Sequence, residues 1–166
     1  MLVLGIDPGT ATTGFGLVES NRDKLKLIDY GIIKTAANIK MPERLCQISS
    51  KVNKIIAEYK PDAVAIEELY YFKNAKTVIT VAQSRGVIMM TAAMADKEIA
   101  EYTPLQVKQS VVGYGKADKK QVQLMVKAIL NMEDLPKPDD AADALAIAIC
   151  HIHSHRLGNI FKGGLK

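Results

Sequence analysis

Four acidic side chains occur in sequence surroundings where a charge is costly unless it has a use. Asp7 and Glu67 each end a short apolar run, and Asp140 and Asp143 lie three positions apart in a helical pattern, so that they share one helix face. Carboxylates that converge repel one another unless cations neutralise them. The pattern therefore predicts that these four side chains bind divalent metal ions.

An all-oxygen site of this kind favours Mg²⁺, with Mn²⁺ as a substitute. Two such ions roughly 3.5–4 Å apart can clamp a phosphodiester, one activating water and the other stabilising the leaving oxygen. We therefore expect two ions per active site and direct hydrolysis, without a covalent enzyme intermediate.

Structural roles compete with the metal site at each position. Asp7 precedes a Pro-Gly pair, where Asp is an ordinary turn former. Asp140 lies near a helix start, where an acid is a favoured cap, and Asp139 competes for that role. Strand alternation leaves open whether Glu67 or Glu68 faces the side of the sheet that carries Asp7.

Asp143 is the acid that a structural role explains least. Small apolar residues surround it, and a cap cannot account for a charge so far inside a helix.

The elements that would position these acids follow from periodicity. Three strands are expected near the N-terminus, with an irregularity near Gly31, joined as an antiparallel meander: 2–6, 12–18 and 25–34. Helices and strands then alternate: a helix from Pro42 to Tyr59, a strand at 63–67, a helix from an Asn74 cap to about Ala95, and a strand at 99–102.

Helices complete the chain: one from Thr103 to Gly113, one opened by a capping box of Asp118 and Gln121, and one over about 139–155. The order predicts an α/β fold with a five-stranded mixed sheet flanked by helices. One domain is expected over residues 1–157, and 158–166, with three glycines and two lysines, is expected to be a mobile tail.

Composition is that of a globular protein with a polyanionic partner. Hydrophobic residues make up 48% and charged residues 24% of 166 residues. The net charge is +4, and setting the four acids aside leaves 22 basic against 14 acidic side chains, or +8. No apolar run is long enough to span a bilayer or resembles a signal peptide. Cys46 and Cys150 are expected to be packed, reduced thiols of a cytoplasmic protein.

Three segments carry a family resemblance, in order along the chain: GIDPGT at 5–10, AIE at 65–67 and DAADALA at 140–146. They resemble the acidic motifs of the RuvC Holliday-junction resolvases. Segments 82–87 and 106–113, and Lys119 followed by 121–123, resemble that family too, so the likeness extends from about residue 2 to residue 153. The opening motif alone is unspecific, because actin-like ATPases begin similarly, whereas the ordered set is specific.

The resemblance implies a ribonuclease H-like fold and a homodimer in which each subunit nicks one of two strands of like polarity at a four-way DNA junction. It implies 5′-phosphate and 3′-hydroxyl ends, and the branch-migration proteins RuvA and RuvB as partners. Asp7, Glu67, Asp140 and Asp143 would be the catalytic acids; some members carry His at the position of Asp140.

Basic and aromatic residues are candidate DNA contacts. By resemblance, Lys108 and Lys119 would contact DNA near the cut, and Tyr70, where Phe is common, would stack at the junction centre. Lys116 lies beside a helix start that suits phosphate. Arg85, on an apolar helix face, either pairs with an acid or faces the junction. Solvent exposure is the competing explanation for the lysines.

Several further residues have no single predicted role. Tyr71 and Phe72 anchor their loop as readily as they stack on DNA, and the histidines at 151, 153 and 155 receive no role. The apolar positions Val78, Val81, Ile88 and Met89 are candidates for a dimer interface, which the sequence does not separate from core.

Three rival functions remain at this point. A nuclease of the YqgF type, which processes ribosomal RNA precursors, opens with a similar strand but would lack the aromatic loop and the segments of Lys108 and Lys119. A junction-binding protein without catalysis would not need Asp143. An actin-like ATPase needs two such domains and a far longer chain.

Overall fold

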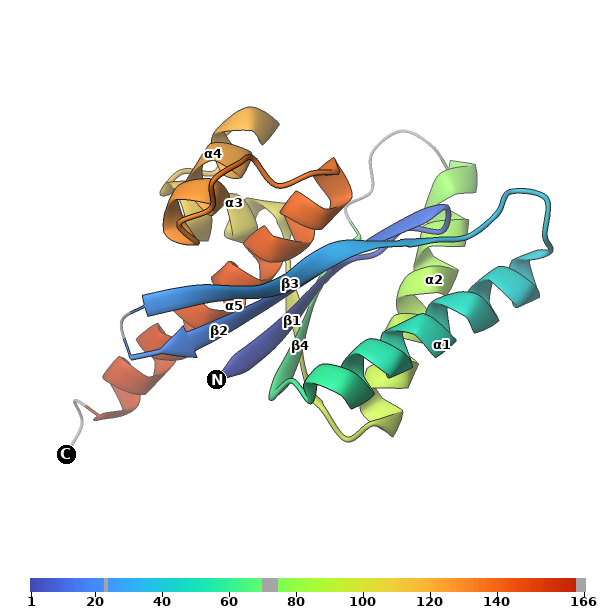
Figure 1. Ribbon diagram of the computed structural model, residues 1–166, viewed down its shortest axis with the longest axis horizontal. Coiled ribbons are helices and arrows are strands. Elements are labelled where there is room, and N and C mark those ends of the chain that lie inside the picture. The colour runs from blue at the N-terminus through green and yellow to red at the C-terminus, as the bar shows by residue number, and fades with distance from the viewer. Residues whose placement is uncertain (23, 70–74, 164–166) are drawn as a thin grey trace.

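A computed structural model describes residues 1–22, 24–69 and 75–163 (Figure 1). Its strands are β1 (Leu2–Asp7), β2 (Thr12–Asn21), β3 (Lys24–Lys34), β4 (Ala63–Glu67) and β5 (Glu98–Tyr102). Its helices are α1 (Met41–Tyr59), α2 (Ala75–Met94), α3 (Pro104–Val112), α4 (Lys119–Ile129) and α5 (Asp139–Gly163).

The five strands form one mixed sheet in the order β3-β2-β1-β4-β5, which confirms the predicted fold class. β1, β2 and β3 pair antiparallel as the expected meander, whereas β4 pairs parallel with both β1 and β5. Ile6 of β1 lies opposite Ile66 of β4. Because these neighbours run in the same direction, the acids that follow them, Asp7 and Glu67, end at the same edge of the sheet.

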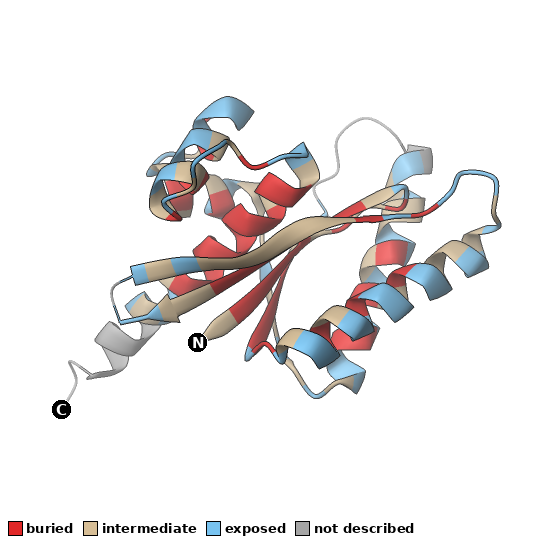
Figure 2. Cartoon of the chain, viewed as in Figure 1, coloured by how far each residue is buried: buried red, intermediate tan, exposed pale blue. Residues whose placement is uncertain are grey.

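Helices cover both faces of the sheet (Figure 1). α1 and α2 pack on one face over a core that includes Leu4, Ile6 and Ile66. α3, α4 and α5 pack on the other face, where α5 lies directly against β1 and β2. α5 is buried over most of residues 141–152 (Figure 2), as expected of a helix that is apolar on all sides.

The local signals for helix ends are confirmed where the structure describes them. Pro42 lies in the first turn of α1. The Asp118 side chain accepts a hydrogen bond from the Gln121 backbone N–H, and the Gln121 side chain accepts one from the Asp118 N–H, which is the predicted capping box of α4. A second capping box joins Thr103 and Gln106 at α3. The predicted cap at Asn74 lies outside the described residues.

Two expectations about the elements change in detail. β3 carries the predicted irregularity, but at Ile28, opposite the step between Leu17 and Val18, whereas Gly31 pairs regularly with Phe15. α5 does not end near residue 155 but continues to Gly163. Pairing across strands decides a bulge, and the local sequence of one strand does not reveal it.

The two cysteines differ from each other. Cys150 is buried in α5 as predicted, but Cys46 is exposed on α1, so the expectation that both are packed was wrong. Within the part of the chain that the structure describes, no helix has both the length and the apolar character to cross a bilayer.

Candidate active site

Asp7 and Glu67 lie side by side where β1 and β4 end. Each is partly buried, and the Asp7 carboxylate contributes to the electrostatic potential at Glu67. Strand alternation had left open whether Glu67 or Glu68 faces the side of the sheet that carries Asp7, and the structure places Glu67 there. Glu68 instead donates its backbone N–H to the carbonyl of Tyr102.

α5 brings the second pair of acids to this edge, because glycines let it lie directly on the sheet. A Cβ atom on Gly14 of β2 would lie 1.9 Å from the Asp140 carbonyl oxygen, and one on Gly5 of β1 would lie 2.1 Å from that of Ala144. Any side chain at either position would push the helix away. These glycines were not among the residues predicted to matter for the site; the run of alanines around Asp143 was the signal for such close packing.

The acids share one electrostatic environment. Burial raises the pKa of Asp7 to about 7, with Asp143 and Asp140 adding to the effect. Burial also raises the pKa of Glu67 to about 8, with Asp7 and Asp143 adding to it. Burial raises the pKa of Asp143, although Lys119 opposes it. The carboxylates are therefore close enough to penalise one another's charge, which is the arrangement that a cation would relieve.

Lys119 forms an ion pair with one of these acids, Asp143. Its Nζ lies 3.0 Å from Oδ2 of Asp143 and 3.4 Å from Oδ2 of Asp139. Burial lowers the pKa of Lys119, but the two carboxylates outweigh it and hold the pKa above its ordinary value. Asp139 is exposed and also accepts a hydrogen bond from Gln123. Its contacts are therefore with the first turns of α4.

A cavity of about 180 Å³ opens beside the carboxylates. Glu67, Asp143, Lys108 and Lys119 all line it, together with apolar residues of α3, α4 and α5. Lys108 also lowers the pKa of Glu67, so it lies within electrostatic reach of that carboxylate. Two of the three candidate lysines are thus brought to the acids.

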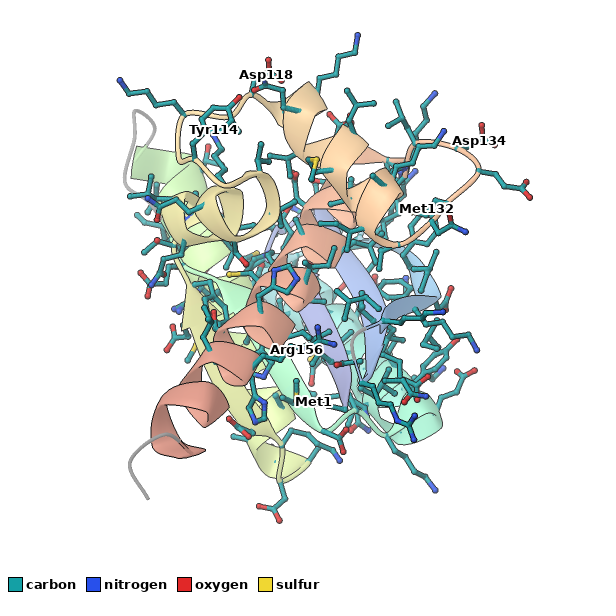
Figure 3. All side chains as sticks on the ribbon, turned by 90° about the vertical axis from the view of Figure 1, so that its left-hand side faces the viewer. Met1, Tyr114, Asp118, Met132, Asp134 and Arg156 are labelled. Carbon is teal, nitrogen blue, oxygen red and sulfur yellow. The ribbon has the colours of Figure 1, made fainter. Side chains whose placement is uncertain are left out.

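Lys116 is exposed in the link between α3 and α4 and is not among the residues that line this cavity. Tyr114 and Asp118, which flank Lys116 in the same link, lie at the end of the molecule away from Met1 (Figure 3). Since β1 runs from that terminus toward Asp7, the link lies at the same end of the fold as the carboxylates.

Arg85 has acidic and backbone partners. Its guanidinium forms an ion pair with Glu101 of β5, and its Nε donates a hydrogen bond to the backbone carbonyl of Glu67 at 3.2 Å. Of the two alternatives in the sequence analysis, pairing with an acid is what the structure shows. Tyr70, together with Tyr71 and Phe72, lies outside the described residues.

The structure separates core from surface on α2, which the sequence had left open. Ile88 is fully buried in the core, so it is not available to a partner. The exposed apolar side chains are Ile79, Met90 and Met94, at 61%, 52% and 80% exposure. Among the described residues, these three side chains give α2 an exposed apolar outer face.

The four acids suit divalent metal ions in their chemistry. Hard cations prefer carboxylate oxygens, and the pKa values of Asp7 and Glu67 are raised first by burial and then by the neighbouring carboxylates, so a bound cation would relieve both costs. As placed, no three His, Cys, Asp or Glu side chains among the described residues are close enough to hold one ion together. Asp143 faces Lys119, so this side chain would have to rotate to serve as a ligand.

Comparison with known proteins shows the family. A family model described as crossover junction endodeoxyribonuclease RuvC matches residues 3–151. The chain belongs to the RuvC family. It is 64% identical to crossover junction endodeoxyribonuclease RuvC of Syntrophomonas wolfei, covering 98% of this chain and 94% of the relative, and 55% identical to that of Alkaliphilus metalliredigens, covering 98% and 99%.

A solved RuvC structure is similar over nearly the whole fold. Thermus thermophilus RuvC, in complex with a Holliday junction substrate, superposes with a TM-score of 0.91 at 35% identity, covering 95% of this chain and 96% of that one. The fold is therefore ribonuclease H-like, and the protein is an endodeoxyribonuclease of the crossover-junction type. RuvC nucleases depend on divalent metal ions. This membership decides against the YqgF, ATPase and purely structural alternatives.

Proposed function

We propose that this protein nicks two strands of like polarity symmetrically at a four-way DNA junction, in recombination and repair, and leaves 5′-phosphate and 3′-hydroxyl ends. The observation that carries the proposal is the coupling of Asp7, Glu67, Asp140 and Asp143 at one edge of the sheet, beside a cavity lined by Lys108 and Lys119. The RuvC relatives are consistent with it.

The four acids would hold two Mg²⁺ ions per active site, or Mn²⁺ in their place. Such ions supply activation of water and stabilisation of the leaving oxygen. Asp7 and Glu67 are fixed to strand ends and so approach from the sheet, while Asp140 and Asp143 approach from α5. Asp143 would release Lys119 as it turns toward the ions, which frees that ammonium for the DNA.

Lysines around the cavity would bind the phosphates that flank the cut. Lys108 and Lys119 reach the cavity from α3 and α4, and Lys116 lies in the link between Tyr114 and Asp118, which are at the end of the molecule away from Met1. Lys119 is the first residue of α4, where the helix dipole also favours an anion. Tyr70 is proposed to stack at the junction centre. For Arg85, contact with DNA would require it to leave Glu101 and the Glu67 carbonyl.

A homodimer would match the two-fold symmetry of the substrate, because each of two related strands needs one active site. The exposed apolar face of α2, formed by Ile79, Met90 and Met94, supports this part of the proposal. RuvA and RuvB as partners, and a cytoplasmic location, are proposed from the family alone.

A cleavage assay tests the proposal directly. Purified protein is incubated with a four-way DNA junction, linear duplex DNA and single-stranded RNA, each with Mg²⁺, Mn²⁺ or a chelator. We expect cutting of the junction alone, at symmetric positions, only with a metal ion, and products that ligase reseals. Equal cutting in chelator, a preference for RNA, or binding of the junction without cutting would each contradict the proposal.

Substitution of Lys119 by alanine is expected to weaken junction binding and cutting more than alanine at Lys137, an exposed lysine before α5. The reason is that Lys119 lines the carboxylate cavity, so it is placed to neutralise a phosphate. Loss of one phosphate contact lowers the slope of log K against log salt by about one. Titrations of labelled junction at several salt concentrations measure this slope. Equal slopes for the two variants would show that Lys119 does not contact a DNA phosphate.

A further inference from the structure

Arg85 of α2 connects the helix to the strand end that carries Glu67. Its Nε donates to the Glu67 carbonyl at 3.2 Å, and its guanidinium pairs with Glu101 of β5. Glu101 lies opposite Ile66 in the β4–β5 ladder, so Arg85 bridges two neighbouring strands next to the acid. The side chain of Arg85 is only 19% exposed, which limits the orientations open to it.

Ser84, the preceding residue, connects the same turn of α2 to the segment after Asp7. Its hydroxyl lies 3.0 Å from that of Thr10, and Ser84 is fully buried. The contact continues through a buried network, because the Thr10 carbonyl accepts from the Thr35 hydroxyl at 2.6 Å, and Arg44 of α1 donates to that hydroxyl at 2.8 Å. The turn after β1 is thereby tied to both α1 and α2.

Two consecutive residues of one helix thus contact the segment that follows β1, through Thr10, and the end of β4, through Glu67. The Asp7 carboxylate lies within electrostatic reach of Glu67, so these two neighbouring strand ends carry side chains of like charge that repel each other. The pairing between β1 and β4 stops at Ile6 and Ile66, one residue before the two acids. A helix turn is rigid, and a pair of contacts from it fixes the spacing between the two ends.

We propose that Ser84 and Arg85 are positioning residues that set the distance between the carboxylates of Asp7 and Glu67 and so determine metal affinity. The inference rests on the proposed metal-dependent function. Arg85 then acts on the Glu67 backbone rather than on DNA.

Matched variants from the opposite end of the sheet make the test specific. Arg156 of α5 donates to the Ser20 hydroxyl at 2.9 Å and to the Arg22 carbonyl, so it repeats the guanidinium-to-carbonyl contact at the end of the molecule where Met1 lies, away from Tyr114 and Asp118 (Figure 3). The comparison is therefore Ser84→Ala against Ser20→Ala, and Arg85→Gln against Arg156→Gln. Thermal unfolding in chelator reports the loss of stability for each pair.

Mn²⁺ binding, followed by electron paramagnetic resonance on the full chain, is the main measurement. We expect affinity to fall about 10- to 100-fold in Ser84→Ala and Arg85→Gln, the range for residues that support metal ligands, and to stay near the wild-type value in the two controls. Cutting rates at saturating Mg²⁺ should recover toward wild type, and junction affinity in chelator should not change.

Mn²⁺ affinities equal to those of the controls would overturn the proposal while leaving the proposed function intact. Weaker junction binding by Arg85→Gln in chelator would overturn the role of Arg85, since it would show a DNA contact. A wild-type protein that neither binds Mn²⁺ nor cuts junctions would overturn the metal site itself, and the inference with it.

Discussion

Asparagine at Asp143 is expected to lower the rate of junction cutting by more than about a hundredfold, the upper end of what loss of a supporting residue costs a metal site. Asp143 is the helix acid that lines the cavity with Glu67, and asparagine removes the charge while keeping the shape. Junction binding should persist or tighten, because one negative charge is lost beside the phosphate.

Single-turnover cutting and junction titration in Ca²⁺ measure the two effects separately. Asp139→Asn is the matched control, since Asp139 lies on the same helix and also pairs with Lys119 but does not line the cavity. We expect this control to keep most of its cutting. If both variants lost cutting equally, the loss would be explained by the broken ion pair with Lys119, and Asp143 would not be a metal ligand.

In chelator, the protein is expected to lose stability as the pH rises from about 4 to 8. The pKa of Asp7 is raised from 3.8 to about 7 and that of Glu67 from 4.5 to about 8, by burial first and then by the neighbouring carboxylates. The folded state therefore binds more protons than the unfolded state across this window, and the free energy of unfolding falls as those protons leave. Divalent ions should reverse the loss, most strongly at the alkaline end.

Asp7→Asn is expected to raise the melting temperature in chelator at pH 8 while abolishing cutting. One pKa unit corresponds to about 1.4 kcal/mol. Since Asp7 is partly exposed, we expect a gain of about 2 kcal/mol, or roughly 4–8 °C for a chain of this size. The exposed Asp134→Asn is the control. A wild-type melting temperature that rises between pH 5 and 8 in chelator would contradict the shifted pKa values.

Much of the fold was predictable because its signals are local. Capping at Asp118, proline near the start of α1, and apolar periodicity depend on residues a few positions apart, and all were confirmed. The bulge at Ile28 and the burial of Ile88 depend on which strand or helix lies opposite. The sequence of one element does not show which element packs against it. The position of the bulge was therefore not predicted, and whether Ile88 belongs to the core or to an interface stayed open.

For the candidate site, the sequence by itself determined which acids have no inexpensive structural role: two that end buried strands and two on one helix face. Only the tertiary structure decided that Glu67 rather than Glu68 lies beside Asp7, that Lys119 pairs with Asp143, and that α2 contacts the segment after β1 and the end of β4. The physical reason is that apolar sequence neighbours indicate that a charge will be buried and therefore costly. The groups that interact with this charge come from distant segments, which only folding brings together.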